Sequence, residues 1–280
     1  MKIRLMTNED FDFVLNQTVR EGWSSCRDDF EELIKYDSNG SFVAEINREP
    51  IGMVCTVNYG KFGFIGNLII APDYRGHNYG KTLMRYAMKY LLDSGTRSLF
   101  LDGVQKAVSL YEHLGFKRIT KSLRLESSFK GEKTRNTRLM SEGDFENIKT
   151  IDSLHFGGDR NDFLRMRFSK HPELSYVLEC ENELQGFIMG RYSNQGALKI
   201  GPWVMVSYSA NAEELLRAIA SNPSVELMKI GVLETNTAAR DMLKRYGFKI
   251  TTFSWRMIYG EETKSTLSNH LYAIGGPERG

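Results

Sequence analysis

A turn between an apolar segment and a helical pattern contains the residue types that bind phosphate groups. Residues 71–84 read Ala-Pro-Asp-Tyr-Arg-Gly-His-Asn-Tyr-Gly-Lys-Thr-Leu-Met and follow the apolar run Leu68-Ile69-Ile70. Backbone N–H groups at the start of a helix have no partner within the helix, and the helix dipole adds positive potential there. A strand, a turn with Gly, Asn and a basic residue, and then a helix therefore predict a site for a phosphorylated ligand.

The spacing of the glycines distinguishes three kinds of phosphate loop. The nucleotide P-loop, Gly-x4-Gly-Lys-Ser/Thr, is matched at its end by Gly80-Lys81-Thr82, but Arg75 occupies the place of its first Gly. The dinucleotide fingerprint Gly-x-Gly-x-x-Gly does not occur in the chain. Residues 75–80, Arg-Gly-His-Asn-Tyr-Gly, instead resemble the coenzyme A pyrophosphate loop of the GNAT acetyltransferase superfamily, Arg/Gln-x-x-Gly-x-Gly/Ala. Asn78 stands where the first Gly of that motif is usual, and Asn tolerates left-handed backbone angles best among non-Gly residues.

A second segment that resembles the superfamily lies further along the chain. The strand pattern Leu99–Asp102 is followed by a short helical pattern that ends at Gly115-Phe116. The arrangement Ala-x-x-Leu-Tyr-x-x-x-Gly-Phe over residues 107–116 is similar to the second cofactor-binding segment of GNAT proteins. Val104 stands where that family usually has Asn, so one cofactor contact differs. Two such segments in this order favour membership of the superfamily.

The resemblance implies how the co-substrate acetyl-CoA is held. The pantetheine arm is expected to lie along residues 67–70 like an added strand, using backbone hydrogen bonds. In GNAT proteins a bulge in this strand opens the sheet and directs an N–H group at the thioester carbonyl, and Gly66-Asn67 is its predicted position. The loop at residues 75–81 is expected to bind the pyrophosphate. The cofactor-binding residues implied in this way are Asn67, Leu68, Ile69, Ile70, Arg75, Gly76, His77, Asn78, Tyr79, Gly80, Lys81 and Tyr111.

The resemblance also implies catalytic roles. Tyr111 corresponds to the helical Tyr that lies beside the coenzyme sulfur in the family and protonates the departing thiolate. Many relatives carry a Glu on the fourth strand as a general base, but residues 64–70 contain no carboxylate. Asp102, at the end of its strand, is the remaining candidate for the base, acting directly or through water. Binding of a substrate ammonium group and a simple capping role are the alternatives for Asp102.

The chain contains an internal repeat. Arg4-Leu5-Met6-Thr7 recurs as Arg138-Leu139-Met140-Ser141, and Asp10-Phe11 recurs as Asp144-Phe145, at an offset of 134 residues. The residue pattern of each copy predicts, in chain order, a strand, a helix, two or three strands, a helix, a strand, a helix and a strand. The predicted fold class is therefore a mixed α/β protein with two tandem GNAT-like folds, each having a central, mostly antiparallel sheet flanked by helices.

The second copy lacks the phosphate loop. No Gly remains in the corresponding segment, and Glu213-Glu214 bring negative charge where a pyrophosphate would lie. Leu243 replaces the Tyr, although Asn236-x-x-Ala239 keeps part of the second cofactor segment. We therefore predict a second copy that has lost cofactor binding. Arg75, Gly76, Asn78, Gly80 and Lys81 align with Ser209, Ala210, Ala212, Glu214 and Leu215.

Composition limits the functional classes. The 280 residues carry a net charge of +2, which gives no reason to invoke nucleic acid or a membrane as a partner. The three Cys residues suit a reducing compartment, no Cys/His spacing suggests a metal site, and the polar start is unlike a signal peptide. We predict a cytoplasmic protein, with an oligomer left open. The predicted domains are an acetyl-CoA-binding GNAT domain at 1–130, a degenerate GNAT-like domain at 137–260, and a C-terminal tail at 261–280.

The sequence thus predicts an N-acetyltransferase that moves an acetyl group from acetyl-CoA to a primary amine of a small molecule, by direct attack in a ternary complex. A protein or peptide amine is an alternative acceptor, and transfer of another acyl group is a further alternative. A coenzyme A-binding sensor or scaffold without turnover is an alternative of a different class. Retention of Tyr111 argues against the sensor, because a binding protein has no need of an acid for the leaving group.

Overall fold

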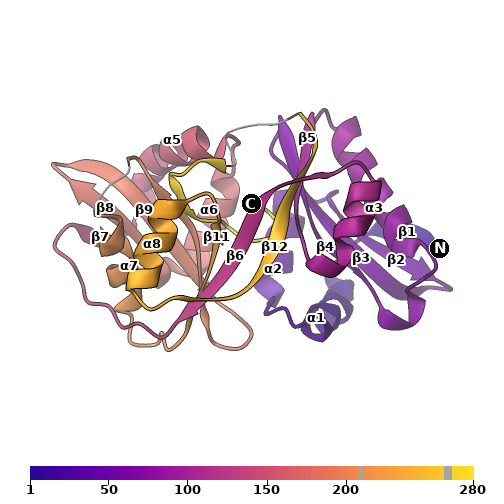
Figure 1. The fold of residues 1–280 in the computed structure, drawn as a ribbon, viewed down its shortest axis with the longest axis horizontal. Coiled ribbons are helices and arrows are strands. Elements are labelled where there is room, and N and C mark those ends of the chain that lie inside the picture. Colours follow the sequence, from indigo (N-terminus) through magenta and orange to yellow (C-terminus); the bar gives the residue numbers. More distant parts are fainter. Residues whose placement is uncertain (208–210, 262–266) are drawn as a thin grey trace. The chain divides into compact units, whose positions relative to one another are not determined.

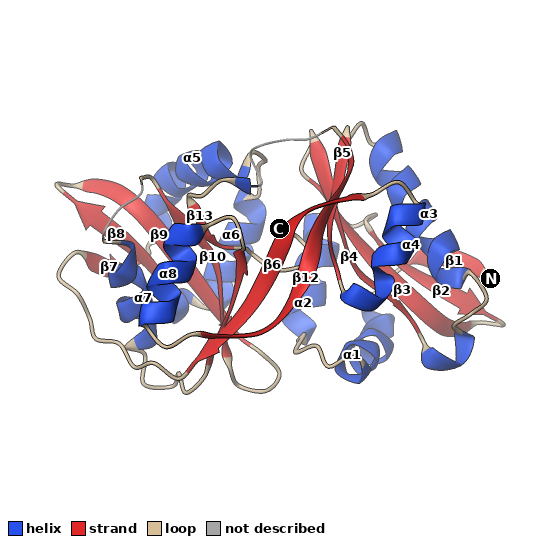
Figure 2. Ribbon diagram, in the orientation of Figure 1, coloured by secondary structure: helices blue, strands red, loops and turns tan. Residues whose placement is uncertain are grey.

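The computed structural model describes residues 1–207, 211–261 and 267–280. The chain forms two compact units (Figures 1 and 2). Unit 1 contains Met1–Ile119, the described part of Trp255–Glu262, and Arg279. Unit 2 contains Thr120–Ser254, the described part of Thr263–Glu278, and Gly280. The sheet and flanking helices in each unit confirm the predicted mixed α/β fold class.

Unit 1 is built around a sheet in the order β1-β2-β3-β4-β5-β12. Neighbouring strands are antiparallel except β4 and β5, which are parallel. Helices α3 and α4 cover one face, and α1 and α2 cover the other (Figure 1). The strands are β1 (Lys2–Leu5), β2 (Ser41–Ile46), β3 (Glu49–Asn58), β4 (Phe62–Ile70), β5 (Ser98–Gly103) and β12 (Lys249–Gly260). The helices are α1 (Phe11–Arg20), α2 (Arg27–Tyr36), α3 (Tyr79–Asp93) and α4 (Val108–His113).

The apolar face of α3 explains why this helix packs on the sheet. Its buried residues recur with helical spacing and form one cluster with strand residues such as Val54 and Ile65. Burying this stripe against the β3–β4 surface holds the N-terminus of α3 beside the end of β4. The α3 residues in the cluster are Leu83, Met84, Ala87, Met88 and Leu91.

The two copies exchange their last strands. Strand β12 comes from the second copy, yet residues Trp255–Gly260 pair antiparallel with β5 of unit 1. In turn β6 (Lys117–Ser127), the last strand of the first copy, pairs with β11 (Met228–Leu233) of unit 2. Met257 of β12 is buried in the same cluster as the α3 residues. The domain boundaries near residues 130 and 137 stay a prediction. Because of the strand exchange, each compact unit contains a strand from the other copy.

Unit 2 repeats the architecture in the order β6-β11-β10-β9-β8-β7, with β13 paired to β10. Strands β10 and β11 are parallel, as β4 and β5 are in unit 1. Its further strands are β7 (Thr137–Leu139), β8 (Ser175–Cys180), β9 (Glu183–Tyr192), β10 (Leu198–Met205) and β13 (Leu271–Ala273). Its helices are α5 (Phe145–Phe156), α6 (Asn161–Lys170), α7 (Ala212–Ala220) and α8 (Thr237–Arg245).

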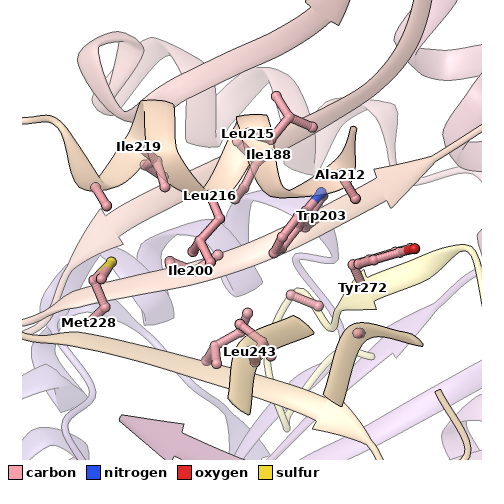
Figure 3. Close-up of a cluster of buried hydrophobic side chains, with 14 of the residues drawn as sticks. Ile188, Ile200, Trp203, Ala212, Leu215, Leu216, Ile219, Met228, Leu243 and Tyr272 are labelled. Carbon is pink, nitrogen blue, oxygen red and sulfur yellow. The ribbon is translucent and has the colours of Figure 1, made fainter. Parts of the chain in front are cut away.

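The core of unit 2 lies between its sheet and helices α7 and α8 (Figure 3). Trp203 of β10 is fully buried there, and its ring centroid lies 5.2 Å from that of Tyr272 on β13. Leu215 and Ile219 of α7 and Leu243 of α8 point into the same cluster. Leu215 and Leu243 stand at the positions of Lys81 and Tyr111 in the first copy, and both are packed in this core.

The repeat extends to individual side-chain contacts. Arg4 donates to Asp10 at 2.7 and 2.8 Å and to Glu45 at 2.9 Å. Arg138 makes the same contacts with Asp144, at 2.8 Å each, and with Glu179, at 2.9 Å. Each ion cluster ties the first strand of its copy to the start of the first helix. The tandem organisation predicted from the sequence is therefore present in the side chains as well as in the topology.

Histidine stacking in unit 2 leads to a prediction about pH. His155 of α5 stacks on His270, with ring centroids 4.0 Å apart, and its buried Nε2 has no hydrogen-bond partner. Burial, together with His270, lowers the pKa of His155 below its ordinary value, although Asp152 acts in the opposite direction. The unfolded chain therefore takes up this proton first as the pH falls below about 6.5, so stability is lost below that pH and is fully present above it.

We expect His155→Phe to reduce this pH dependence, because Phe keeps the ring and removes the titrating group. The measurement is the midpoint of chemical denaturation between pH 7.5 and pH 5.5 in both proteins. If the midpoint falls equally with pH in the wild type and in the variant, His155 is not the source of the pH dependence.

Candidate active site

Strand β4 contains a bulge at the predicted position. Cys55 of β3 pairs with Gly66 and Met53 pairs with Ile69, so two residues of β4, Asn67 and Leu68, lie opposite one residue of β3. Asn67 takes a left-handed backbone angle, φ 53°. The bulge interrupts the hydrogen-bond ladder with β3 and turns backbone groups away from it. The prediction of a bulge at Gly66-Asn67 is confirmed.

Strands β4 and β5 part beyond the bulge. Their parallel pairing joins residues 62–64 to residues 98–100 and then stops, although β4 continues to Ile70 and β5 to Gly103. Gly66, Asn67, Leu68 and Ile70 are half-buried, whereas the first four residues of the strand are buried. Among the described residues, the edge of β4 that faces away from β3 therefore has no strand partner there. Such an edge can hydrogen-bond an extended ligand as an added strand.

The loop after β4 leaves a row of backbone donors exposed. The first hydrogen bond of α3 runs from Thr82 N to Asn78 O at 3.1 Å. In the part of the chain that the structure describes, the N–H groups of residues 76–81 donate to no protein acceptor. Gly76 and Asn78 have φ angles of 85° and 61°, which turn the chain so that these groups precede the helix. The first turn of α3 contains no acidic residue, so the arrangement suits an anion.

Asn78 replaces the usual Gly without strain beyond what Asn tolerates. Its φ and ψ of 61° and 9° lie in the left-handed region that Asn visits most readily among non-Gly residues. His77 is exposed, and its ring centroid lies 5.6 Å from that of Tyr79. Tyr79, Gly80 and Lys81 are half-buried at the start of α3. The departure from the family motif at Asn78 therefore leaves the loop geometry intact.

Two basic side chains beside the loop are held by one carboxylate. Arg75 donates from Nε to Ile70 O at 2.8 Å and from Nη2 to Glu21 at 2.5 Å. Lys106 donates to the other oxygen of Glu21, also at 2.5 Å. Burial opposes ionisation of Glu21, but the hydrogen bonds from Lys106 and Arg75 outweigh it and lower the Glu21 pKa. Glu21 thus remains charged at neutral pH and ties the end of α1 to the loop.

Tyr111 is buried against the end of β5. Its side chain is 7% exposed, and a Cβ placed on Gly103 would lie 2.9 Å from its ring atoms Cδ2 and Cε2. Burial raises the pKa of Tyr111, so the phenol stays protonated at neutral pH. Among the described residues its hydroxyl has no hydrogen-bond partner. The group is therefore an available proton donor.

The contact between Gly103 and Tyr111 gives a test of ring placement. We expect Gly103→Ala to move the Tyr111 ring by several tenths of an ångström, because neither the β5 backbone nor the buried ring has room for the added methyl group. If Tyr111 protonates the leaving thiolate, a ring displaced in this way should do so less well, and kcat should fall while affinity for coenzyme A changes little. Steady-state kinetics and calorimetric titration measure the two quantities. A wild-type kcat would show that this contact does not position the hydroxyl.

Asp102 is paired with an arginine from the second copy. Arg256 of β12 lies directly opposite Asp102 in the register and donates from Nε at 2.5 Å and from Nη2 at 3.4 Å. The two side chains are 0% and 1% exposed, and the guanidinium lies 4.8 Å from the centroid of the Phe64 ring. Because the Asp102 side chain is fully buried in this pair, an acceptor amine could reach it only if the surrounding structure opened. This geometry weighs against Asp102 as a general base, which stays a prediction.

Asp102 and Tyr111 lie on opposite faces of β5. Successive side chains of a strand point to opposite faces, and the Tyr111 ring contacts Gly103, next to Asp102. Tyr111 belongs to the face covered by α3 and α4, whereas Asp102 points to the face covered by α1 and α2. The structure therefore brings both residues to the end of β5 but not to each other.

Three functional candidates were missed by sequence reasoning. Arg256 was missed because its partner strand is 154 residues away in sequence. Glu21 lies in a segment without a recognisable motif, and Lys106 lies beside the second GNAT-like segment without being one of its motif residues. Nothing in the sequence around Arg256 indicates a partner for its side chain. Only the exchange of strands shows that it lies opposite Asp102.

No group of three or more metal-ligating side chains occurs among residues 1–207, 211–261 and 267–280. Within the same described ranges, no helix is long and apolar enough to cross a membrane.

Comparison with known proteins bears on this geometry. The acetyltransferase (GNAT) family model matches residues 8–116, and a second acetyltransferase (GNAT) domain model matches residues 148–273. Holothin acyltransferase of Pseudoalteromonas sp. strain SANK 73390 is 23% identical over 275 residues, which cover 97% of this chain and 92% of that protein. An uncharacterized N-acetyltransferase of Bacillus subtilis strain 168 is 23% identical over 259 residues, covering 90% of this chain and 89% of the relative.

Solved structures share the two-copy fold. A proposed acetyltransferase from Pyrococcus horikoshii superposes with a TM-score of 0.85 at 22% identity, covering 100% of this chain and 95% of that one. A tandem GNAT protein from the clavulanic acid biosynthesis pathway gives a TM-score of 0.66 at 10% identity, covering 94% and 99%. Two GNAT models match successive parts of the chain, and two acyltransferases align over nearly its whole length. The parted strands β4 and β5 and the loop that follows β4 agree with this match. The chain therefore belongs to the GNAT acetyltransferase family and is a tandem two-domain acyltransferase.

Proposed function

We propose that unit 1 transfers an acetyl group from acetyl-CoA to a primary amine of a small molecule. The observation that carries the proposal is the parting of β4 and β5 next to the row of free N–H groups at residues 76–81. The parted edge offers backbone partners to the pantetheine arm, and the N–H groups, with Arg75 and Lys81 nearby, suit the pyrophosphate. The two features adjoin along one continuous segment, as one extended cofactor requires.

The proposed reaction is a direct attack in a ternary complex. The neutral amine attacks the thioester carbonyl, a C–N bond forms, and the C–S bond breaks to release the coenzyme A thiolate. A backbone N–H group of the bulge at Asn67-Leu68 polarises the carbonyl and stabilises the developing oxyanion. Tyr111 then gives its proton to the thiolate, the amine loses a proton to a base or water, and the Tyr111 phenolate is reprotonated from solvent, which restores the enzyme. Tyr111 suits the role because it is protonated at neutral pH and its hydroxyl is unpaired among the described residues.

A small-molecule acceptor is proposed from the relatives. One relative is named for acyl transfer to holothin, and one structural neighbour comes from the clavulanic acid biosynthesis pathway. Both names associate these proteins with small molecules. The left-handed conformation of Asn78 keeps the loop turn that Gly would give, which favours cofactor binding, while Val104 and the lack of a carboxylate in residues 64–70 keep the sensor as the alternative to be tested.

The test is a panel of amines with acetyl-CoA and detection of the released thiol. We expect thiol release well above hydrolysis with small primary amines and little with peptide amines. Gly80→Glu is the control, because it places a carboxylate in the first turn of α3 where the pyrophosphate would lie. Tight coenzyme A binding without thiol release for any acceptor would support the sensor instead. A panel of acyl-CoA esters would show whether another acyl group is preferred.

A further inference from the structure

The parting of two parallel strands occurs in both copies, but in unit 2 the gap is filled. Strands β10 and β11 pair from Leu198–Met228 to Ile200–Ile230, and β10 then continues to Met205. The bulge is repeated as well, because Gly201 and Pro202 lie between the pairs that Ile200 and Trp203 form with β9. Gly201 is related to Asn67 by the repeat offset of 134. The slot that receives pantetheine in our proposal for unit 1 is thus present in unit 2.

The occupant of this second slot is the chain itself. Strand β13 pairs antiparallel with β10, with Trp203 opposite Ala273 and Val204 opposite Leu271. These β10 residues correspond to Ile69 and Ile70 of unit 1. On the other side, Ile274 N donates to Gly231 O of β11 at 3.0 Å. We call residues 269–274 the plug segment, since they bridge the two parted strands.

Glycines permit this close approach. A Cβ on Gly201 would lie 2.0 Å from Ile274 O, and a Cβ on Gly231 would lie 2.8 Å from Ile274 Cγ1. Leu271, Tyr272, Ala273 and Ile274 are each at most 5% exposed. The plug segment is therefore an integral part of the core of unit 2 (Figure 3).

The residue retained from the second cofactor segment holds the plug segment. Asn236 is 1% exposed, and its Nδ2 donates to Asn269 O at 2.8 Å and to Leu271 O at 3.0 Å. Its Oδ1 accepts from Ala239 N at 3.0 Å and caps α8. The Asn236 amide thus holds both the turn before β13, through Asn269 O, and the first residue of β13, through Leu271 O.

We propose that the plug segment is a built-in, permanent substitute for the pantetheine arm, so that the second copy binds no coenzyme A. This inference concerns unit 2 and extends the proposal that unit 1 holds the cofactor. Loss of the phosphate loop is consistent with it: Ala212, Glu214 and Leu215 form the first turn of α7, while Ser209 and Ala210 lie outside the described residues. Because the plug segment fills the place where a pantetheine arm would lie, a pyrophosphate site beside it would bind no cofactor.

The first experiment counts cofactor sites by calorimetric titration with coenzyme A. We expect one site per chain in the wild type and none in Gly80→Glu, which alters only the loop of unit 1. Two sites in the wild type, or coenzyme A binding that persists in Gly80→Glu, would overturn the proposal. If the wild type binds no coenzyme A, the proposed function of unit 1 is wrong. The second experiment, which does not depend on coenzyme A binding by unit 1, then decides whether the plug segment is held in place.

The second experiment follows hydrogen exchange of the plug segment. We expect the amides of residues 271–274 to be protected equally with and without coenzyme A. Asn236→Asp keeps the cap to Ala239 but loses both donated hydrogen bonds, so exchange of these amides should become at least tenfold faster. Asn222→Asp is the matched control, since Asn222 caps an exposed turn at Ser224 in the same unit. Loss of protection on adding coenzyme A, or an Asn236→Asp protein with unchanged exchange, would contradict a plug held in this way.

Discussion

Tyr111→Phe should lower kcat by about 10²–10⁴-fold, the range that a positioned general acid contributes, while leaving affinity for coenzyme A nearly unchanged. The substitution removes one oxygen from a ring whose burial between Gly103 and Phe116 is apolar. Because the hydroxyl has no partner among the described residues, its loss leaves no other group unsatisfied. The stability of the variant should therefore match that of the wild type. Rapid-quench or steady-state kinetics and calorimetric titration separate the two effects.

Tyr86→Phe provides the control for this prediction. Tyr86 lies on α3, is 44% exposed, and contacts Phe42, outside the proposed site. Both variants lose one tyrosine hydroxyl group. A difference in kcat between them therefore reports on where the hydroxyl lies and not on the loss of a hydroxyl as such. A Tyr111→Phe enzyme that turns over at the wild-type rate would remove Tyr111 from the mechanism.

Arg256→Met should lower the free energy of unfolding by about 3–5 kcal/mol, the cost of leaving one member of a buried ion pair without its partner. Asp102 has no exposed side-chain surface, so water cannot replace the guanidinium without opening the β5–β12 pair. The double variant Asp102→Leu/Arg256→Met should recover most of this loss, because apolar residues of similar volume often replace a buried pair at little cost. Chemical denaturation of the four proteins of the cycle gives the coupling between the two residues.

Lys89→Met serves as the matched control, since Lys89 and Asp93 form an exposed pair with side chains 74% and 62% exposed. That change should alter stability by less than about 1 kcal/mol. The double variant also tests the base. If it is folded and still acetylates amines, Asp102 is a structural partner of Arg256; if it is folded but inactive with normal coenzyme A affinity, the carboxylate takes part in the reaction. Equal stability of Arg256→Met and the wild type would refute the buried-pair account.

The local elements, the bulge in β4 and the turn at residues 75–80 were predictable because their signals are local. Gly76, Asn78 and Gly80 are spaced by the requirements of one turn, and the bulge at Asn67 follows from its place in the same strand. The repeat offset predicted two similar folds, since equal patterns of apolar residues favour equal elements. These features depend on neighbours within a few residues along the chain.

The strand exchange and the plug segment were not predictable in this way. Strands β6 and β12 occupy the same place in the two copies, so each fits the edge of β5 or of β11 by pattern alone, and only tertiary packing decides. Arg256 gained its role from that choice. The plug segment lies in what reads as a Gly- and Pro-containing tail, although the apolar run Leu271–Ile274 was a signal that it packs against something. Its partner residues are distant in sequence, which is why the run by itself did not identify the slot.

The exchanged strand has a consequence for how the chain is made. Unit 1 obtains its last strand only when residues 255–260 have left the ribosome, although the rest of that unit ends at Ile119. During synthesis of the intervening residues, the edge of β5 therefore has no partner from its own unit. Exposed strand edges promote pairing with other chains, and contacts that are distant in sequence form slowly. The first copy therefore completes its sheet only after nearly all of the second copy has been synthesised.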